Sequence, residues 1–424
     1  MKYIFPLVIL FLSQLSLAQQ NNIKGSYKGS FIFGNFQSDL SLNILKTNDQ
    51  YDIQFTSLDQ NAFGIPARDI EIHQDSIKFA LQSDSYRYEF KGILLNNNVL
   101  QMILIVDGNS FEFQLQKENK DNSQGVKSKD IRFRSENLLL YGTVYYPVKP
   151  NGKAIYLVTS SGNNDRSASR AEALMFAQNG FITLHTDKRG TGISDGNWQK
   201  ADMPILCNDD ILAIQYLSQI EKLPLNHIGI KGSSQGASKV PYIMSKLPEL
   251  MFGIAVSCPG STLLESDLNY WKNRNKTIID AQYIAQATQM QKSVFQYISG
   301  DLSKDKLEEG IQANKNESWF EYIWIPAPEE VETDLKLNYS PLPYFKLVKQ
   351  PLLVLEGSMD QVIPPSSLSI IKKSVPAKRR SKNKYLTLKG ADHSMMYKGK
   401  SDFPYWQALH PDYIKTMLKW IDKL

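Results

Sequence analysis

From about residue 131 onward, short apolar runs alternate with longer stretches of helical periodicity. The runs AIYLVT, FITLHT, HIGIKG, GIAVSC, LLVLEG and YLTLKG cover residues 154–159, 181–186, 227–232, 253–258, 352–357 and 385–390. Strands that are apolar along their whole length belong to parallel sheets covered by helices on both faces. In such sheets the crossovers are right-handed and ligands bind at the carboxyl ends of the strands. The pattern predicts an α/β domain with its site at that edge.

Helices are expected over residues 168–178, about 208–219, 236–246, 366–373 and 412–424, and a hairpin over IRFRSENLLLYGTVYYP at residues 131–147. Residues 261–348 interrupt the alternation with a polar stretch rich in Gln, Lys and Asn. Because this stretch is far longer than an ordinary loop, it predicts a helical cap over the carboxyl edge of the sheet.

Residues 19–118 follow a different pattern. Seven short alternating runs, at residues 26–36, 38–47, 49–58, 75–83, 85–95, 98–108 and 110–117, are separated by turn residues. Alternation of this kind is typical of half-buried antiparallel strands and predicts a small all-β barrel or sandwich. Residues 119–130 are charged and almost free of apolar side chains, which predicts a linker between two domains.

The first 18 residues, MKYIFPLVILFLSQLSLA, are expected to be a secretory signal. Lys2 supplies a positive end, an apolar run follows, and Ser16-Leu17-Ala18 forms a small-residue cleavage pattern before Gln19. The unbroken apolar run is about half of the ~20 residues that a spanning helix needs. We therefore expect an exported mature protein, periplasmic or extracellular, without a membrane span.

Composition narrows the function classes. The 424 residues are 42% hydrophobic and 21% charged, as in an ordinary globular protein. A net charge of +5 is small for this length, so no nucleic-acid partner is expected. The two cysteines, Cys207 and Cys258, are interpreted as small buried residues, although an exported compartment also permits a disulfide. The oligomeric state stays open.

The segment GSSQG, residues 232–236, matches the pattern G-x-S-x-G with Ser234 at the centre. A predicted strand precedes it and a predicted helix follows. Such a tight turn needs glycine where a side chain would clash, and it lifts the central serine clear of the sheet. A phosphate-binding loop is excluded because no Lys follows the second glycine in the required order. A plain Gly/Ser turn remains the alternative.

A serine hydroxyl needs a base to accept its proton. Three of the five histidines are predicted to lie away from Ser234: His73 in the β domain, His227 at the opposite edge of the sheet, and His410 before the last helix. His185, near the end of a strand, is a competitor whose position favours a buried neighbour. His393, in the loop KGADHSMMY after a late strand, is the predicted base.

The base needs an acid that fixes its tautomer. Asp360, in LLVLEGSMDQ, follows the end of another predicted strand and is the expected acid. Glu356 is the stronger rival and Asp392, adjacent to His393, the weaker one. The order Ser234, Asp360, His393 is the nucleophile–acid–histidine order of the α/β-hydrolases.

Four motifs carry a resemblance to that family: VTSSGNNDR (158–166), HTDKRGTGISDG (185–196), GSSQG, and the pair EGSMD and GADH. Residues 131–424 resemble its secreted esterase-like branch, related to dienelactone hydrolases and to prolyl oligopeptidase catalytic domains. FTSLDQNAFGIPARDI, at residues 55–70, also resembles β modules attached to such enzymes. Where the branch usually has a His-Gly pair, this chain has Thr159 and Ser160.

The resemblance implies an α/β-hydrolase sheet with a cap, no metal or organic cofactor, and an oxyanion hole made by the backbone N–H groups of Gln235 and Ser161. Gly162 is the alternative to Ser161. Gln235 begins a predicted helix, whose first N–H groups are unpaired. The expected function is hydrolysis of a small carboxylic ester through an acyl-enzyme. A serine peptidase, an acyltransferase and a non-catalytic binding protein on the same fold stay open.

The loop 187–192 is expected to be structural, with Arg189 holding neighbouring carbonyl groups. The basic run 372–384 is interpreted as a solvated surface loop. The cap aromatics, expected to form the core of the cap rather than a substrate pocket, are Tyr270, Trp271, Trp319, Tyr322 and Trp324.

Overall fold

A computed structural model describes residues 23–424, apart from 49, 83–86, 97, 119–124, 327–332, 378–380, 398 and 400. The predicted signal, residues 1–18, lies outside the described residues. The chain divides into two compact units, which are taken in turn. The smaller unit holds most of the chain up to residue 118, and the larger one contains everything from residue 119 onward.

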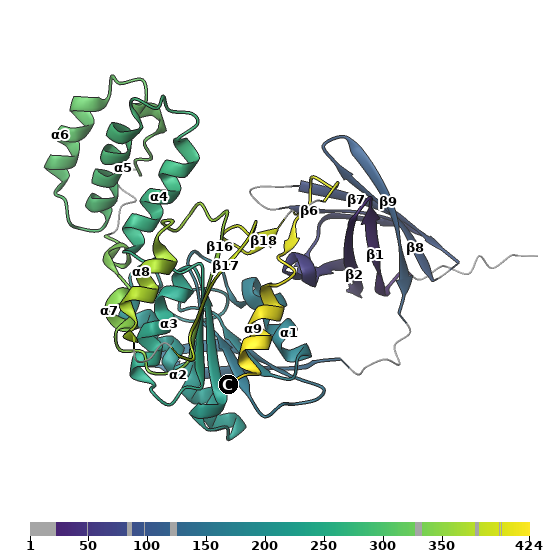
Figure 1. Ribbon diagram of the computed structural model, residues 1–424. Helices are drawn as coiled ribbons and strands as arrows, with labels where there is room; N and C mark the ends of the chain where they lie inside the picture. Colours follow the sequence, from purple (N-terminus) through teal and green to yellow (C-terminus); the bar gives the residue numbers. More distant parts are fainter. Residues whose placement is uncertain are drawn as a thin grey trace, which may run out of the picture. The chain divides into compact units, whose positions relative to one another are not determined.

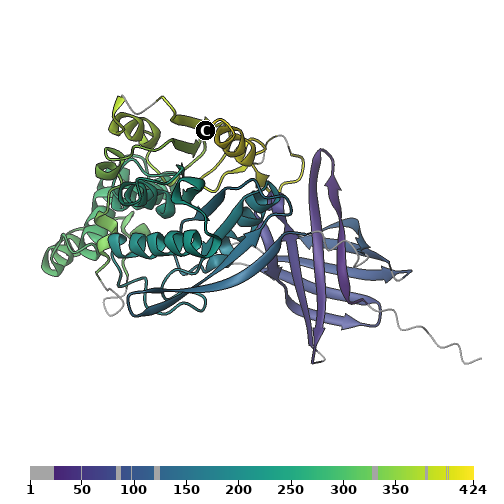
Figure 2. The same cartoon turned by 90° about the horizontal axis from the view of Figure 1, so that it is seen from below.

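The smaller unit is built on one antiparallel nine-stranded sheet in the order β4-β3-β2-β1-β9-β8-β7-β6-β5. Figure 2 shows the first strands, in purple, crossing the later strands of the same sheet, in blue. The two edge strands, β4 and β5, are separated by Ala67 alone, so the sheet curls until its edges approach each other. The strands are β1 (Gly25–Phe33), β2 (Phe36–Thr47), β3 (Gln50–Ser57), β4 (Ala62–Pro66), β5 (Arg68–His73), β6 (Ser76–Gln82), β7 (Arg87–Leu95), β8 (Val99–Val106) and β9 (Asn109–Lys117).

Buried and more exposed side chains alternate along the strands, which explains why these segments form a sheet with one face on a core. In β8 every second residue, from Leu100 to Val106, is buried, as a strand with one face on a core requires. The core is aromatic: the rings of Phe79 and Phe90 stack with their centroids 4.9 Å apart, and Phe31 meets Phe113 edge-on at 5.7 Å. The prediction of a small all-β unit is confirmed, with a nearly closed barrel as its form.

The larger unit has an eight-stranded sheet in the order β10-β11-β13-β12-β14-β15-β16-β17. The pairings from β12 to β17 and that of β12 with β13 are parallel, whereas β10 and β11 form an antiparallel hairpin that joins β13. The strands are β10 (Lys127–Ser135), β11 (Leu138–Tyr146), β12 (Ala154–Leu157), β13 (Ile182–Thr186), β14 (Ile228–Ser233), β15 (Phe252–Val256), β16 (Leu352–Gly357) and β17 (Lys384–Leu388).

The hairpin begins earlier than expected. β10 starts at Lys127, inside the range 119–130 assigned to a linker, and residues 119–124 lie outside the described part of the chain. β10 starts early because it pairs with a long partner strand. Lys127 to Asp130 lie opposite Tyr146 to Thr143 on β11, so these polar residues form strand hydrogen bonds as well. Local composition does not reveal such a partner.

Helices cover both faces of the sheet, as predicted (Figure 1). One hydrophobic core packs α2 (Met203–Glu221), α3 (Gln235–Lys246), α7 (Leu342–Phe345) and α8 (Ser367–Ser374) against one face. The other core contains α1 (Arg170–Gln178) and α9 (Tyr413–Ile421). α2 begins about five residues before its predicted start because Asp202 caps it, accepting a hydrogen bond from the backbone N–H of Ile205.

The insertion is helical, as predicted, and Figure 1 shows its helices gathered together. They are α4 (Leu263–Asn275), α5 (Ile284–Ile298) and α6 (Lys304–Asn314). Trp271 and Trp319 are buried in the cap's own core, whereas Tyr270 and Trp324 are exposed. α4 also binds the loop after β16, where the Asn269 side chain donates to the carbonyls of Val362 and Ile363 at 3.0 and 3.1 Å.

Cys207 in α2 and Cys258 after β15 are both free and buried. Within the described ranges, no helix combines the length and the apolar character needed to cross a membrane.

Candidate active site

The turn between β14 and α3 holds Ser234 in a strained conformation. Its φ and ψ are 55° and −122°, a region that residues other than glycine rarely adopt. The flanking glycines make this possible, because a Cβ on Gly232 would lie 2.4 Å from the carbonyl oxygen of Gly236. The backbone N–H of Ser234 donates to Val256 O at 2.9 Å, which ties the turn to β15. The serine side chain therefore stands at the carboxyl edge of the sheet.

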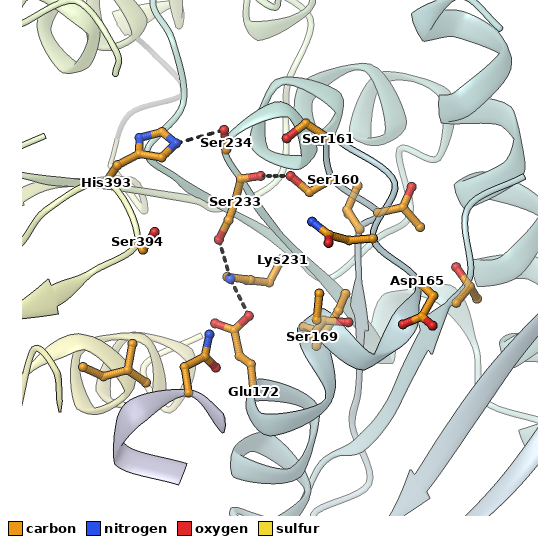
Figure 3. Close-up of a pocket in the computed structure, with 18 of the residues that line it drawn as sticks. Ser160, Ser161, Asp165, Ser169, Glu172, Lys231, Ser233, Ser234, His393 and Ser394 are labelled. Carbon is orange, nitrogen blue, oxygen red and sulfur yellow. Dashed lines mark hydrogen bonds and ion pairs between the residues drawn. The ribbon is translucent and has the colours of Figure 1, made fainter. Parts of the chain in front are cut away.

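The structure brings Ser234, His393 and Asp360 into one hydrogen-bonded chain. His393 Nε2 lies 3.0 Å from Ser234 Oγ, the contact drawn as a dashed line in Figure 3. On the other side of the ring, Nδ1 lies 3.0 and 2.9 Å from the two carboxylate oxygens of Asp360. Residues separated by 159 positions in the sequence thus meet within hydrogen-bond distance. A neutral imidazole that donates from Nδ1 to Asp360 has Nε2 free to accept the serine proton.

Neighbouring groups fix the positions of Asp360 and His393. Asp360 is almost fully buried, with its side chain 3% exposed, and Oδ1 also accepts from the backbone N–H of Val362 at 2.8 Å. The hydroxyl of Ser257, itself at a positive φ of 50°, donates to the backbone carbonyl of His393 at 2.7 Å. Asp360 and His393 are therefore fixed by separate loops.

The two alternative acids, Glu356 and Asp392, form hydrogen bonds with groups other than the His393 ring. Glu356 accepts a hydrogen bond from the hydroxyl of Thr387 at 3.0 Å. Asp392 caps its own turn, accepting from the backbone N–H groups of Ser394 and Met396 at 2.9 Å each. No hydrogen bond joins either carboxylate to the His393 ring within the described chain.

The rival base, His185, is buried in the domain. Its side chain contacts the hydroxyl of Ser169 through Nδ1 at 3.1 Å, and Nε2 is buried without a partner among the described residues. Burial lowers the pKa of His185 to about 3, so the ring is neutral at physiological pH. His227 instead contacts Gly152 O through Nδ1 at 3.0 Å, at the far end of β14.

The expected oxyanion donors lie beside the serine. Ser161 and Ser234 line two shared cavities, one of them also lined by Gln235. Gln235 is the first residue of α3, and within the described residues no group accepts a hydrogen bond from its backbone N–H or from that of Ser161. Ser160 fixes the intervening backbone, since its hydroxyl donates to Ser233 O at 2.9 Å (Figure 3).

No protein-family model matches this chain, and no curated protein matches it. Among solved structures, the α/β hydrolase GrgF from Penicillium sp. sh18 is 15% identical with a TM-score of 0.45, covering 70% of this chain and 98% of that one. The Pyrococcus furiosus esterase Pf2001 is 15% identical with a TM-score of 0.46, covering 72% and 94%. A puromycin hydrolase is 12% identical with a TM-score of 0.43, covering 84% and 48%.

Lys188 is a site residue that sequence reasoning missed. It reaches under the loop after β12, where Nζ donates to the carbonyls of Ser160, at 2.9 Å, and Gly162. Its ammonium also lies 4.2 Å from the centre of the Trp198 ring. Lys188, rather than Arg189, holds neighbouring carbonyls. Arg189 instead forms a two-bond ion pair with the buried carboxylate of Asp209, at 2.6 and 2.7 Å.

A second buried cation supports the same loop. Lys239 on α3 is fully buried and pairs with Asp210 on α2 at 2.6 Å. Lys239 Nζ also donates to the hydroxyl of Thr159, which in turn donates to Asp210 at 3.1 Å. Thr159, where the resembling branch has another residue, is thereby anchored to two helices. The segments that carry Thr159, Asp210 and Lys239 lie far apart in the sequence, and none of them gives a local signal for this network.

A third pair lies next to Ser234. The Lys231 ammonium bonds the carboxylate of Glu172 and the hydroxyl of Ser233, at 2.5 and 2.7 Å (Figure 3). The same carboxylate accepts from the hydroxyl of Tyr413 at 2.8 Å. The Ser233 side chain is thus turned toward the inside of the protein, away from the His393 ring that contacts Ser234.

Two cavities flank Ser234. The first cavity, of about 240 Å³, is lined by Ser161, Ser234, His393, Ser394 and Tyr413 together with Asn61, Leu157, Val158, Thr159, Ser160, Asn164, Asp165, Ala168, Ser169, Glu172, Thr186, Lys231, Ser233 and Leu409. The second cavity, of about 220 Å³, lies toward the cap and is lined by Ser161, Gly162, Trp198, Ser234, Gln235, Pro259, Leu263, Ser266, Asp267, Asp334, Lys336, Leu337 and Val362. None of the five cap aromatics lines either cavity among the described residues. Within the same ranges, no cluster of three or more His, Cys, Asp or Glu side chains could hold a metal ion.

Proposed function

We propose that this protein is an exported serine hydrolase that cleaves carboxylic esters of small molecules through an acyl-enzyme. The observation that carries the proposal is the position of His393, whose ring contacts Ser234 Oγ at 3.0 Å and Asp360 at 2.9 Å. A nucleophile, a base and an orienting acid within hydrogen-bond distance are the elements of acyl transfer to serine. Export is proposed from residues 1–18 alone.

In the first step Ser234 Oγ attacks the ester carbonyl carbon while His393 Nε2 takes the hydroxyl proton. Asp360 stabilises the imidazolium that forms and keeps Nδ1–H in place. The carbonyl oxygen becomes negative and accepts hydrogen bonds from the backbone N–H groups of Gln235 and Ser161. Each such donor is worth about 3 kcal/mol in the transition state.

In the second step the tetrahedral intermediate collapses. The bond from carbon to the alcohol oxygen breaks, and His393 gives its proton to that oxygen, so the alcohol departs neutral. Water then attacks the acyl-serine with His393 again as the base, and the carboxylic acid and the free serine are restored. No step needs a metal or an organic cofactor.

Small substrates suit the cavities beside Ser234, because volumes of about 220 and 240 Å³ hold side-chain-sized groups. The strained backbone at Ser234 and the completed hydrogen-bonded chain both argue against a binding protein with a dead site, since strain persists where a function needs it.

The test is covalent labelling followed by turnover. The purified mature chain is treated with a fluorophosphonate probe and assayed on p-nitrophenyl esters of short and long acyl chains, alongside chromogenic peptides. We expect Ser234→Ala to abolish both labelling and ester turnover, while Ser233→Ala keeps labelling. Labelling that persists in Ser234→Ala would overturn the nucleophile assignment, and peptide cleavage without ester cleavage would overturn the esterase.

A further inference from the structure

The two cavities that flank Ser234 differ in one residue of the proposed triad. His393 lines the first cavity, of about 240 Å³, and is not among the described residues that line the second, of about 220 Å³. Because His393 must protonate the departing alcohol, the alcohol part of an ester lies in the first cavity, which we call the leaving-group cavity. The acyl part then extends past Gln235 into the second cavity, toward the cap, which we call the acyl cavity.

Asp267, on the cap helix α4, lines this acyl cavity with an unpaired carboxylate. No hydrogen bond or ion pair joins its side chain to any residue that the structure describes. Asp267 is exposed at the surface of the chain as well as lining this cavity. Partial loss of water around the carboxylate raises the pKa of Asp267 to about 6, with a further contribution from the charge of Asp334. Asp267 is therefore mostly ionised near pH 7, and no described side chain forms an ion pair with it.

The lysine of the same cavity is already occupied. Lys336 pairs with Asp334 at 2.8 Å and donates to the backbone carbonyls of Gln199 and Ala201 at 2.9 and 3.4 Å. Its side chain is only 3% exposed. The cavity lining thus holds two carboxylates and one lysine, and that lysine forms an ion pair with Asp334. One negative charge, that of Asp267, is left over.

A second acceptor in the cavity also lacks a partner. Gln235 lines the acyl cavity, and its side-chain Oε1 is buried without a hydrogen-bond donor among the described residues. A buried acceptor without a donor is costly unless a partner arrives. The apolar part of the wall, Pro259, Leu263, Leu337 and Val362, suits a hydrocarbon spacer between the ester and a charged end.

We propose that the acyl cavity selects esters whose acyl chain ends in a cationic nitrogen, and that Asp267 is the residue that recognises this charge. The inference rests on the proposed function, because it assumes that an acyl group is attached to Ser234. Asp267 touches the substrate and takes no part in the bond changes, so it is a specificity-determining residue. The predicted substrate class is esters of short ω-ammonio acids.

The decisive measurement compares matched substrates. p-Nitrophenyl esters of ω-trimethylammonio acids are paired with neutral isosteres in which a tert-butyl group replaces the trimethylammonium, over spacers of about two to five carbons. The quaternary nitrogen has no lone pair, so these esters cannot cyclise on themselves. For the best spacer we expect the cationic ester to show a kcat/KM about tenfold above that of its neutral partner, as for a partly desolvated charge pair.

Asp267→Asn should remove that preference by lowering kcat/KM for the cationic ester about tenfold while leaving the neutral ester within about twofold. Glu265→Gln is the matched control, because Glu265 lies on the same helix, does not line the acyl cavity and pairs with Lys292 at 3.0 Å. It removes the same net charge and should keep the preference. A preference lost equally in both variants would contradict a specific role for Asp267.

Binding without turnover separates the two proposals. In Ser234→Ala the same esters should raise the Tm, the cationic one more than the neutral one, and Asp267→Asn in that background should equalise the two shifts. Ser234-dependent hydrolysis with equal rates for both esters overturns the cation site and leaves the esterase standing. Absence of labelling and of turnover, with a cation-selective Tm shift that needs Asp267, overturns the esterase and leaves the cation site standing. Equal Tm shifts for the two esters count against the site.

Discussion

The ammonium of Lys188 lies 2.9 Å from the carbonyl oxygen of Ser160, one residue before the expected oxyanion donor Ser161. The same ammonium binds Gly162 O, so it holds the carbonyls on both sides of Ser161. Peptide units are planar, and fixing the C=O of Ser160 fixes the N–H of Ser161 that belongs to the same peptide. Lys188 is therefore a positioning residue for the proposed oxyanion hole, acting through the backbone.

Replacing Lys188 by Met should lower kcat for a neutral ester by about tenfold with KM within about twofold, because the loop loses its anchor and a transition-state contact weakens. Lys306→Met, an exposed lysine of α6, is the control and should leave both parameters unchanged. Steady-state kinetics on the p-nitrophenyl esters decides between these outcomes. An increase of KM alone in Lys188→Met would place the residue in substrate binding instead.

The same residue predicts a pH dependence. Burial, with a smaller effect of Lys239, lowers the pKa of Lys188 from 10.5 to about 8. As pH rises through about 8 the folded protein loses this charge, so kcat should fall there in the wild type and not in Lys188→Met. Stability changes in the opposite sense, since the unfolded chain keeps the proton up to 10.5 and binds more protons than the folded one. Rate profiles of both proteins between pH 7 and about 10 test this.

The buried pair of Lys239 and Asp210 should dominate the stability of the site. Lys239→Met leaves a buried carboxylate without its cation and should cost about 3–5 kcal/mol of unfolding free energy. The double variant Lys239→Met, Asp210→Leu removes both charges and should recover most of this loss. Its kcat should nevertheless stay low because Thr159 loses both partners. Urea denaturation and kinetics of the three proteins give the comparison, and equal stability of single and double variants would contradict it.

His185 should act on stability and not on catalysis. Its pKa is about 3 in the folded protein and 6.5 in an exposed histidine, so unfolding takes up one proton between these values. Stability from this group is present above pH 6.5 and is lost on acidification, with a slope of about 1.4 kcal/mol per pH unit. His185→Gln should flatten that slope and keep ester turnover at pH 7, whereas His393→Gln should reduce turnover by about 10⁴-fold or more. Loss of turnover in a folded His185→Gln would move the base to His185.

The predicted secretory signal, residues 1–18, lies outside the described residues and can be tested directly. Expressed in a bacterium with its full sequence, the chain should be cleaved after Ala18, so Edman sequencing of the exported protein should begin at Gln19. A chain lacking residues 1–18 should stay in the cytoplasm with the same specific activity. Export with the N-terminal sequence intact would instead indicate an uncleaved anchor.

The sequence predicted those features of the fold that depend on residues close together along the chain. The apolar runs predicted β14 and β16 within one residue, because a strand buried on both faces needs continuous hydrophobic side chains. Motif spacing selected Ser234, Asp360 and His393, which follow strand ends that a parallel sheet must bring to one edge. Lys188, Lys239 and Asp267 escaped prediction because their partners lie far away in the sequence. A lone lysine or aspartate carries no sign of which carbonyl, carboxylate or cavity it will meet.

Gly357, the last residue of β16, controls how closely the loops that carry Asp360 and His393 approach each other. A Cβ at this position would lie 2.3 Å from the carbonyl oxygen of Ala391 and 2.4 Å from that of Asp392, the two residues before His393. Neither oxygen can move without shifting the backbone that carries the base. Gly357→Ala should therefore displace His393 from Asp360, lower kcat about 100-fold with KM little changed, and cost about 1–3 kcal/mol of stability.

The matched control for Gly357→Ala is Gly310→Ala in α6. There a Cβ would meet only the flexible end of Met290, at 3.6 Å, and alanine should raise stability by about 0.5–1 kcal/mol because it is the better helix former. Thermal unfolding and ester kinetics of both variants give the comparison. Full activity in Gly357→Ala would mean that the two loops can separate by several tenths of an ångström without loss, and that the 2.9 Å contact of His393 with Asp360 does not limit the rate.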